Sequence, residues 1–359
     1  MHLLNKSSSY RMIGLMSGTS LDGLDICYCS FQNTNSKWQY SILAAETIKY
    51  PIQLINQLKE AHKYTAEQIT ALDFSYGKFL GEQVKRFVSE HGIEADYIAS
   101  HGHTVLHNPT QGYTLQIGKG AAIAASSGVP CISDFRSGDV SRGGQGAPLV
   151  PIGDKLLFHE FDICLNLGGI ANISYNNTRG NRLAYDISVC NMLLNHLAGL
   201  AGKKFDCGGA IGKSGQIIPE MLQELENLEY YNQPSPKSLG REWFESHIIA
   251  ILGRYSSYRL ANLMRTAYEH ISSRIAYDCN KLEKKNILAT GGGAKNDFLM
   301  ELIQEKIKAS ITIPDSNTID FKEALIFAFL GVLYLQNEPG ALASVTGAYS
   351  NSITGCLYH

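Results

Sequence analysis

A turn rich in glycine, hydroxyl and carboxylate residues lies between two apolar runs near the start of the chain. Residues 14–25 read GLMSGTSLDGLD, and the apolar run ICYC follows. Backbone N–H groups and hydroxyl groups in such a turn can bind phosphate oxygens, and glycine lets the backbone approach the ligand closely. Asp22 or Asp25 could hold the water shell of a Mg²⁺ ion, which prefers oxygen ligands. The alternative is a hairpin turn whose Asp and Ser side chains bond their own backbone.

Two further glycine turns follow apolar strands later in the chain. Residues 166–172 read NLGGIAN and offer a second phosphate cradle around Gly168 and Gly169. A third cluster, Gly291-Gly292-Gly293, follows the apolar run NILA and precedes a predicted helix. A glycine run at the carboxyl end of a strand suits the close approach of a nucleotide, although a plain strand-to-helix turn has the same pattern. Three such turns in this order predict a nucleotide held between two domains.

Hydrophobic periodicity predicts an α/β chain with two halves that begin alike. The first half starts with strands and continues with alternating helices and strands, at 10–16, 25–31, about 38–49, 66–91, 96–102, 121–128 and 130–135. The second half opens with a strand, a glycine turn and a strand, followed by helices at about 187–200, 215–227, 241–253 and 257–283. A strand at 286–290, a helix from about 296, the late strand ITIP and the buried helix FKEALIFAFLGVLYL complete it.

The repeated strand-turn-strand openings at 12–30 and 162–175 predict the domain organisation. We expect one domain at 1–133 with a C-terminal return at about 341–359, and a second domain at 134–340. A chain of 359 residues is long enough for two domains with separate cores.

Composition limits the classes of protein that the chain can belong to. It is 44% hydrophobic and 18% charged with a net charge of −2, so neither nucleic acid nor an anionic membrane is an expected partner. No apolar stretch reaches the ~20 residues that span a bilayer, and the N-terminus lacks the apolar core of a secretory signal. Several of the eight cysteines lie in apolar runs, and none forms a CxxC pair. We therefore expect a reducing, cytoplasmic location and no structural zinc.

Longer motifs give the chain a specific resemblance. From about residue 11 to 356 it is similar to anhydro-N-acetylmuramic acid kinases, members of the actin-like ATPase and sugar-kinase superfamily. The motifs are GLMSGTSLDGLD, SHGHTVLHNP, TLQIG, SDFRSGDVSRGGQGAPLVP, NLGGIANIS, PKSLGREWF, GGGAKN, KEALIFAFL and SVTGA. The block at 133–151 and the first turn are the most specific of these.

The resemblance implies a fold and a reaction. The fold would be two actin-like (RNase H-like) domains flanking an ATP/substrate cleft. With ATP and Mg²⁺, the enzyme would hydrolyse the 1,6-anhydro ring of anhydro-N-acetylmuramate and phosphorylate O6, giving N-acetylmuramate 6-phosphate for peptidoglycan recycling. The implied general base is Asp186, and Asp22 and Asp25 are the expected metal ligands. The implied nucleotide-binding residues are Gly18, Thr19, Ser20, Leu21, Asp22, Gly23, Leu24, Asp25, Gly168, Gly169, Gly291, Gly292 and Gly293.

The position of Asp186 supports this role on physical grounds. It follows Leu183-Ala184-Tyr185, the end of an apolar segment, and so could lie at a strand end beside the phosphates. Opening an anhydro ring requires a base that takes a proton from water, and a carboxylate can do this. Mg²⁺ and the loops would stabilise the transferring phosphoryl group. The alternative is that Asp186 caps a helix starting near residue 190.

The resemblance also implies residues that hold the sugar: Thr104, Asp134, Arg136, Asn191 and Glu323. Asp134 and Arg136 could instead form an interdomain ion pair. Glu323 could instead be a favourable negative charge at a helix N-terminus.

The chain departs from the family pattern near the expected sugar site. Asp186 to Asn191 read DISVCN where the family usually has Asp-Thr-Gly-Pro-Gly-Asn, whereas His103 and Gly208 replace a usual Gln and a usual acid. The expected partner is a small amino sugar, with a homodimer as one oligomeric option. The alternatives are a kinase for another anhydrosugar or a hexose, and a non-catalytic actin-like nucleotide switch.

Overall fold

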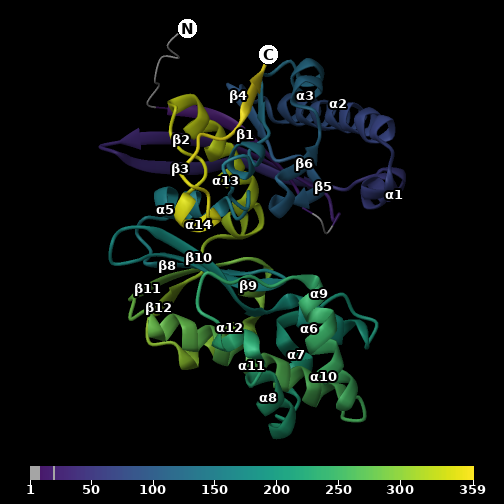
Figure 1. The fold of residues 1–359 in the computed structure, drawn as a ribbon, viewed down its shortest axis with the longest axis vertical. Helices are drawn as coiled ribbons and strands as arrows, with labels where there is room; N and C mark the ends of the chain where they lie inside the picture. Colours follow the sequence, from purple (N-terminus) through teal and green to yellow (C-terminus); the bar gives the residue numbers. More distant parts are fainter. Residues whose placement is uncertain (1–8, 19–20) are drawn as a thin grey trace. The chain divides into compact units, whose positions relative to one another are not determined.

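Figure 1 shows the computed structural model of the chain, which describes residues 9–18 and 21–359. The chain divides into a first unit, Met1–Leu157 with Phe321–His359, and a second unit, Phe158–Asp320. Each unit has a buried hydrophobic core of its own. The α/β class is confirmed, because each unit combines one mixed sheet with helices.

The two units divide the chain at other residues than the predicted boundaries of 133/134 and 340/341. Two helices, α5 (Val150–Leu157) and most of α13 (Ser316–Gln336), belong to the first unit. A Cβ added at Gly153 of α5 would lie 2.6 Å from Ile326 of α13. A Cβ at Gly14 would lie only 1.9 Å from the carbonyl oxygen of Ala324. This long-range packing holds α13 and α5 against the first sheet.

The first unit is built on a six-stranded sheet in the order β13-β7-β4-β1-β2-β3. Its first three strands form antiparallel pairs, β4 and β7 run parallel to β1, and β13 closes the edge antiparallel to β7. The predicted opening of three strands is therefore confirmed. The bounds are β1 (Ser9–Ser17), β2 (Leu24–Thr34), β3 (Lys37–Ile48), β4 (Tyr97–Ser100), β7 (Cys131–Ser133) and β13 (Cys356–Tyr358).

Helices cover both faces of this sheet. On one face, Ile13 and Ile26 share a core with α2, whose capping box pairs Thr65 with Gln68 and whose end is set by the left-handed Gly92. On the other face, α13 approaches β1 so closely that Gly14 has no room for a side chain. The other elements of this unit are α1 (Ile52–Glu60), η1 (Ala61–Lys63), α2 (Ala66–His91), η2 (Pro109–Gln111), α3 (Gly120–Ser127), α4 (Ser137–Val140) and α14 (Ala343–Thr346).

A short hairpin in the first unit was not predicted from the sequence. Strands β5 (His103–Asn108) and β6 (Tyr113–Ile117) pair antiparallel where a polar loop was expected. The two histidines and three threonines of residues 103–117 hide the strand pattern, so its alternation became visible only with the partner strand in place.

The second unit is built on a five-stranded sheet in the order β10-β9-β8-β11-β12. β8, β9 and β10 are joined by antiparallel pairing, and β11 and β12 run parallel to β8. The predicted strand-turn-strand opening is confirmed as the β8–β9 hairpin. The bounds are β8 (Ile163–Leu167), β9 (Ile170–Asn176), β10 (Arg182–Val189), β11 (Asn286–Thr290) and β12 (Ser310–Thr312).

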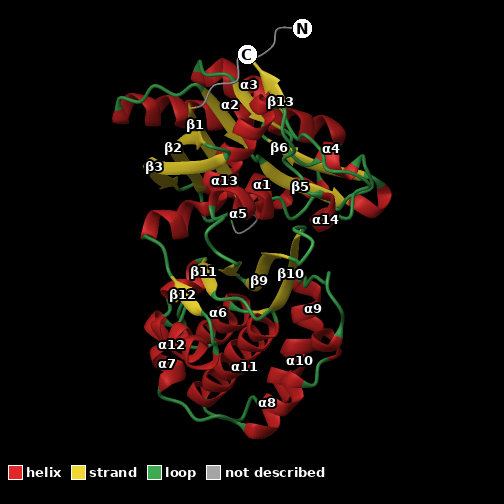
Figure 2. Cartoon of the chain, turned by 90° about the vertical axis from the view of Figure 1, so that its left-hand side faces the viewer, coloured by secondary structure: helices red, strands yellow, loops and turns green. Residues whose placement is uncertain are grey.

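Figure 2 shows helices α7, α11 and α12 gathered beside the strands of this second unit. The helix predicted from about 187 begins only at Asn191, because 182–189 forms β10. The helices are α6 (Asn191–Gly199), η3 (Cys207–Gly209), α7 (Ala210–Lys213), α8 (Pro219–Glu226), η4 (Glu229–Asn232), α9 (Arg241–Trp243), the π-helix η5 (Phe244–Ile248), α10 (Ile249–Arg254), α11 (Leu260–Lys281), η6 (Gly292–Lys295) and α12 (Asp297–Lys306).

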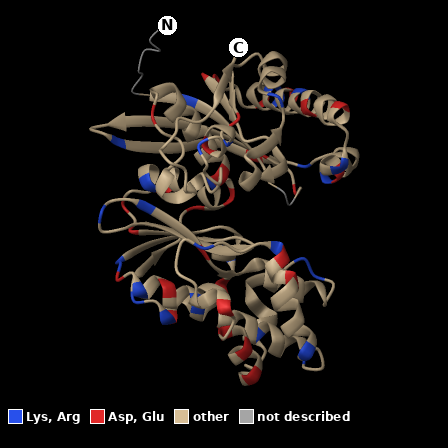
Figure 3. Cartoon of the chain, viewed as in Figure 1, with Lys and Arg blue, Asp and Glu red and all other residues tan. Residues whose placement is uncertain are grey.

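Acidic and basic residues are interspersed over both units (Figure 3). Within residues 9–18 and 21–359, no helix combines the length and apolarity needed to cross a bilayer.

Candidate active site

The first glycine turn joins β1 to β2. Leu21 has a φ of +58° and donates its N–H to the Gly18 carbonyl at 3.3 Å, which makes the turn tight. A Cβ at Gly23 would lie 2.6 Å from the carbonyl oxygen of Ile48, so the chain passes β3 too closely for a side chain. Leu24 is buried in the core and therefore has a structural role. Thr19 and Ser20, also expected to bind phosphate, lie outside the described residues.

The two carboxylates beside this turn differ in their surroundings. Asp22 is exposed, whereas Asp25 is half-buried and accepts a hydrogen bond from the Thr47 hydroxyl at 2.6 Å. Both present oxygen atoms of the type that Mg²⁺ prefers. No group of three or more His, Cys, Asp and Glu in the described part of the chain is arranged to hold a metal ion.

The second and third glycine turns lie side by side in the second unit. They follow the parallel neighbours β8 and β11, in which Asn166 is opposite Thr290. A Cβ at Gly291, whose φ is +81°, would lie 2.6 Å from Oδ1 of Asn166. A Cβ at Gly293 would lie 2.8 Å from the Leu167 side chain. The glycines at 291 and 293 thus allow close packing of the two turns, which the sequence alone predicted only as separate features.

Asn191 links the turn after β8 to the start of α6. Its side-chain Nδ2 donates to the Leu167 carbonyl at 2.9 Å, and its backbone N–H donates to Gly168 at 3.1 Å. The neighbouring Cys190 donates its N–H to Gly169 at 2.9 Å. The expected role of Asn191 in holding the sugar is not tested by these contacts, which show instead that it fixes the glycine turn.

Asp186 lies within β10, at a β-bulge between Asp186 and Ser188. Its Oδ2 accepts the Leu239 N–H at 2.8 Å, and Oδ1 has no hydrogen-bond partner among the described residues. Burial raises the pKa of Asp186 above its ordinary value, and the hydrogen bond from Leu239 opposes that shift. The helix-cap alternative is wrong, because Cys190 occupies the N-cap of α6.

A row of polar residues crosses the second sheet in register with Asp186. Asp186 is opposite Asn172 on β9, which is opposite Asn166 on β8, which is opposite Thr290 on β11. Directly opposed residues share one face of a sheet. The NLGGIAN turn was predicted from the sequence, but its two asparagines were not expected among the site residues, although both lie in the strands that flank the turn. The row aligns the carboxylate with the strand ends that lead into both glycine turns.

In the first unit, Arg136 is held by uncharged acceptors. Its Nε donates to Nε2 of His101 at 3.0 Å and its Nη1 donates to the Gly146 carbonyl at 2.6 Å. The His101 Nδ1 lies 2.9 Å from the Gly102 carbonyl. Burial and the nearby guanidinium lower the pKa of His101 to about 3, so its imidazole is neutral. Burial also lowers the pKa of Arg136 to about 10, which leaves this side chain a cation at neutral pH.

Asp134 and Glu323 do not have the structural roles considered as alternatives. Asp134, at a φ of +63°, accepts the Ser137 N–H at 3.2 Å and forms no ion pair with Arg136 within the described ranges. The ion-pair alternative is therefore wrong. Glu323 lies in the third turn of α13, which begins at Ser316, so it is not an N-terminal charge.

The surroundings of Glu323 perturb its carboxyl group although the side chain keeps contact with solvent. Partial desolvation of the carboxyl group by the surrounding protein raises the pKa of Glu323, and Asp25 adds to this shift, while Arg136 and Lys322 oppose it. Charge interactions therefore connect the first turn, Arg136 and α13 within the first unit.

Thr104 and His103 belong to the β5–β6 hairpin. The Thr104 hydroxyl accepts a hydrogen bond from Nε2 of Gln116 at 3.3 Å. His103, which replaces the usual Gln of the family, is buried with its Nδ1 3.4 Å from the Ser17 hydroxyl. Burial lowers the pKa of His103 to about 4, so this side chain is neutral at physiological pH. The substitution thus keeps an uncharged polar group beside the end of β1.

The altered stretch after Asp186 is part of the core. Ile187, Val189 and Cys190 are fully buried, where the family has Thr, Pro and Gly. These apolar side chains extend β10 up to the start of α6. Gly208, the other departure, has a φ of +58° in η3.

Two α/β units with glycine turns at strand ends, and a desolvated carboxylate in line with two of those turns, are typical of ATP-dependent sugar kinases. The family model described as "Anhydro-N-acetylmuramic acid kinase" matches residues 10–359. The chain belongs to that family, and it is an ATP-dependent sugar kinase.

Curated relatives match nearly the whole chain. "Anhydro-N-acetylmuramic acid kinase" of Actinobacillus pleuropneumoniae serotype 7 (strain AP76) is 33% identical over 365 residues, which cover 96% of this chain and 98% of the relative. The protein of the same name from Rhodococcus erythropolis (strain PR4 / NBRC 100887) is 35% identical over 373 residues, which cover 97% of this chain and 94% of the relative.

Solved structures show only a distant likeness. Component A of (R)-2-hydroxyglutaryl-CoA dehydratase from Acidaminococcus fermentans is 12% identical with a TM-score of 0.46, covering 91% of this chain and 99% of that chain. A ROK family glucokinase from Streptomyces griseus, in complex with glucose and AMPPNP, is 12% identical with a TM-score of 0.39. The match covers 89% of this chain and 98% of that chain. Likeness at this level does not bear on activity.

Proposed function

We propose that this chain is an anhydro-N-acetylmuramic acid kinase. It opens the 1,6-anhydro ring of its sugar and phosphorylates O6, giving N-acetylmuramate 6-phosphate for peptidoglycan recycling. The proposal rests on family membership over residues 10–359. The observation that carries it is Asp186, a desolvated carboxylate with one oxygen held by Leu239 and aligned with two glycine turns.

Asp186 acts as the general base. Its Oδ1 takes a proton from the water whose oxygen bonds to C1 of the sugar, while the bond between C1 and O6 breaks. The freed O6 then forms a bond to the γ-phosphorus of ATP, while the bond from that phosphorus to the bridging oxygen breaks and ADP leaves. Because burial raises the pKa of Asp186, the carboxylate is a stronger proton acceptor than an ordinary aspartate.

The glycine turns bind the phosphates of the nucleotide, and the carboxylates of Asp22 and Asp25 bind its metal ion. Backbone N–H groups at Gly168 and Gly169 and the close packing at Gly291 suit the approach of phosphates. Asp22 and Asp25 would hold Mg²⁺ through oxygen atoms and water. ATP supplies the phosphoryl group, and Mg²⁺ offsets the charge that develops on it.

Arg136 favours an anionic sugar. Its hydrogen bonds go to His101 and to the Gly146 carbonyl, which are both uncharged. The guanidinium stays a cation at neutral pH, with Glu323 as a nearby acidic group, and muramic acid derivatives carry a carboxylate of the kind that a guanidinium binds. Thr104, Asp134, Asn191 and Glu323 would complete the sugar site.

A kinase for another anhydrosugar or for a hexose is the second candidate. The buried Ile187, Val189 and Cys190 favour it, because they change the stretch directly after the proposed base. A nucleotide switch without catalysis has no comparable support, since it does not need a desolvated carboxylate such as Asp186. Dimerisation and a cytoplasmic location remain predictions.

A phosphorylation assay tests the proposal. The chain is incubated with Mg-ATP and a panel of anhydrosugars and hexoses, and the products are analysed by mass. Addition of one water and one phosphate to anhydro-N-acetylmuramate supports the proposed reaction. Addition of phosphate alone to a hexose would support the second candidate, and ATP binding without any phosphorylated product would support the switch.

A further inference from the structure

The segment from Glu229 to Leu239, called here the 229–239 segment, holds Asp186 by three of its polar atoms. The backbone N–H of Asp186 donates to the Lys237 carbonyl at 3.0 Å. The Tyr230 hydroxyl donates to the Asp186 carbonyl at 2.6 Å. The Leu239 N–H donates to Oδ2 of the side chain at 2.8 Å. The orientation of the carboxylate therefore depends on where this segment lies.

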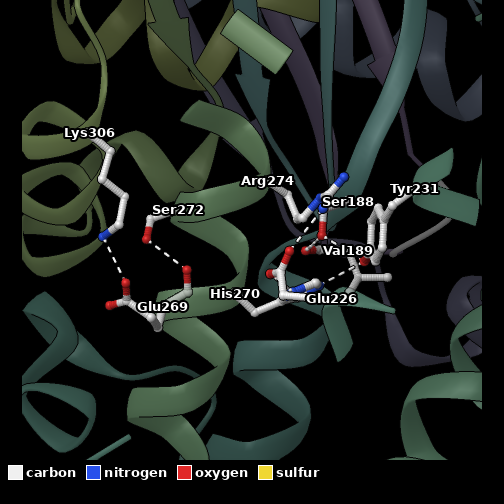
Figure 4. A network of polar contacts seen from close by, with 9 residues as sticks. All are labelled: Ser188, Val189, Glu226, Tyr231, Glu269, His270, Ser272, Arg274 and Lys306. Carbon is white, nitrogen blue, oxygen red and sulfur yellow. Dashed lines mark hydrogen bonds and ion pairs between the residues drawn. The ribbon is translucent and has the colours of Figure 1, made fainter. Parts of the chain in front are cut away.

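A buried chain of polar contacts ties the same segment to two helices and to β10 (Figure 4). The Tyr231 hydroxyl lies 2.8 Å from Nε2 of His270 on α11. The other ring nitrogen of His270, Nδ1, lies 2.6 Å from Oε1 of Glu226 at the end of α8. The Tyr231 hydroxyl also lies 3.2 Å from the Ser188 hydroxyl, just past the bulge that contains Asp186.

The chain of contacts is held by charge and by burial. His270 and Ser188 are fully buried. Burial alone would raise the pKa of Glu226, but His270 and Arg274 together bring it below its ordinary value, so this carboxyl group is ionised. Arg274 lies 2.9 Å from Oε2 of Glu226, and its guanidinium carbon is 4.4 Å from the centre of the Tyr231 ring. These contacts leave Tyr231 little freedom to move.

We propose that Tyr231 and His270 are positioning residues for Asp186. His270, fixed by Glu226, anchors Tyr231, and Tyr231 fixes the 229–239 segment that orients the carboxylate. The inference rests on the proposed function of Asp186 as the base.

Removal of the Tyr231 hydroxyl should change the position of the Asp186 carboxylate, because both contact the 229–239 segment. Without the Tyr231 hydroxyl, Nε2 of His270 is buried without its partner, and Ser188 loses one contact. A shift of about 1 Å in a catalytic group costs up to about a hundredfold in rate. If the Leu239 N–H moves away from Oδ2, the pKa of Asp186 rises, because that hydrogen bond favours the ionised form.

The test compares Tyr231→Phe with Tyr185→Phe. The Tyr185 hydroxyl also donates to a carboxylate, Asp278 Oδ1 at 3.0 Å, and Tyr185 is next to Asp186 in β10. Among the described residues, this hydroxyl forms no hydrogen bond with the 229–239 segment. We expect Tyr231→Phe to lower kcat by about ten- to a hundredfold. The KM for ATP should stay within about twofold, and the acid limb of the kcat profile should move to higher pH. Tyr185→Phe should keep kcat and the acid limb of its pH profile near those of the wild type.

Amide hydrogen exchange at Leu239 supplies a readout that is independent of turnover. Faster exchange of this amide in Tyr231→Phe, with unchanged exchange in Tyr185→Phe, supports the anchoring. If wild-type protein phosphorylates no sugar, the proposed function of Asp186 fails, and the Leu239 amide still decides whether Tyr231 anchors the segment.

A milder variant covers the case in which Tyr231→Phe does not fold. Glu226→Gln keeps the volume of the side chain and weakens its contacts with His270 and Arg274, and Glu226 is 29% exposed. It should show the same acid-limb shift and a smaller loss of kcat. Wild-type kcat, pH profile and Leu239 exchange in a folded variant of either kind would overturn the inference.

Discussion

Replacing Asp186 by Asn removes the proton acceptor while keeping the shape of the side chain. The amide oxygen of Asn can still accept the Leu239 N–H, which lies 2.8 Å from Oδ2 in the wild type. It cannot take a proton from water. We therefore expect kcat to fall by roughly 10²–10⁴-fold, the usual contribution of a positioned base. This equals about 2.7–5.4 kcal/mol of activation free energy.

The same substitution should change stability much less. A hydrogen bond to a charged acceptor contributes about 1.5–3 kcal/mol and one to a neutral acceptor about 1 kcal/mol, so the weaker bond costs on the order of 1 kcal/mol. Loss of the desolvated charge offsets part of this cost. The pKa of Asp186 is raised in the fold, so its contribution to stability is largest at low pH and is lost as the pH rises through that pKa. The stability of Asp186→Asn relative to wild type should therefore be most favourable at neutral pH. There, the Tm values of the two proteins should differ by no more than about 4 °C.

Asp162→Asn is the matched control. Asp162 is in the same unit, and its Oδ2 likewise accepts backbone N–H groups, from Lys285 and Asn286 at 3.1 Å each. It precedes β8, at the opposite end of that strand from the glycine turn. Steady-state kinetics with the true sugar, ATP binding by calorimetry and thermal unfolding are measured on both variants. ATP affinity should stay near wild type in both, and kcat should fall only in Asp186→Asn.

Turnover of Asp186→Asn close to wild type would refute the reasoning and remove Asp186 from the mechanism. A fall in kcat that is matched by Asp162→Asn would assign the effect to stability. A loss of ATP affinity in Asp186→Asn alone would show that the carboxylate helps to hold the nucleotide.

Three further predictions concern Gly291, Arg136 and His101. Gly291→Ala should weaken ATP binding at least about tenfold in calorimetry, because its Cβ would meet Asn166 at 2.6 Å, whereas Gly180→Ala, at a similar φ but in open space, should cost only stability. Arg136→Lys should raise the sugar KM about tenfold or more and leave the ATP KM unchanged, since one ammonium group cannot reproduce the fork that donates to His101 and the Gly146 carbonyl. Because the pKa of His101 is about 3, the sugar KM should show no histidine titration between pH 5 and 8; a break near pH 6.5 would contradict a neutral acceptor.

Local patterns in the sequence determined most of the elements and the turns. The apolar runs around GLMSGTSLDGLD and NLGGIAN predicted the β1–β2 and β8–β9 hairpins, because a glycine-rich turn between two short apolar runs is a nearest-neighbour signal. The spacing of α2 and its terminal Gly92 are equally local. The family resemblance also rests on short motifs, and the match over residues 10–359 confirms it.

Only the tertiary structure decided how the site is held. Leu239 and Asp186 are 53 residues apart, and Arg136 and His101 are 35 apart, so no periodicity in the sequence connects them. The bulge in β10 replaced a predicted helix start, because pairing with β9 outweighs the local pattern after Asp186. Residue types thus determined which groups could do the chemistry. Long-range packing decided which oxygen of Asp186 accepts the Leu239 N–H and which has no hydrogen-bond partner in the described part of the chain.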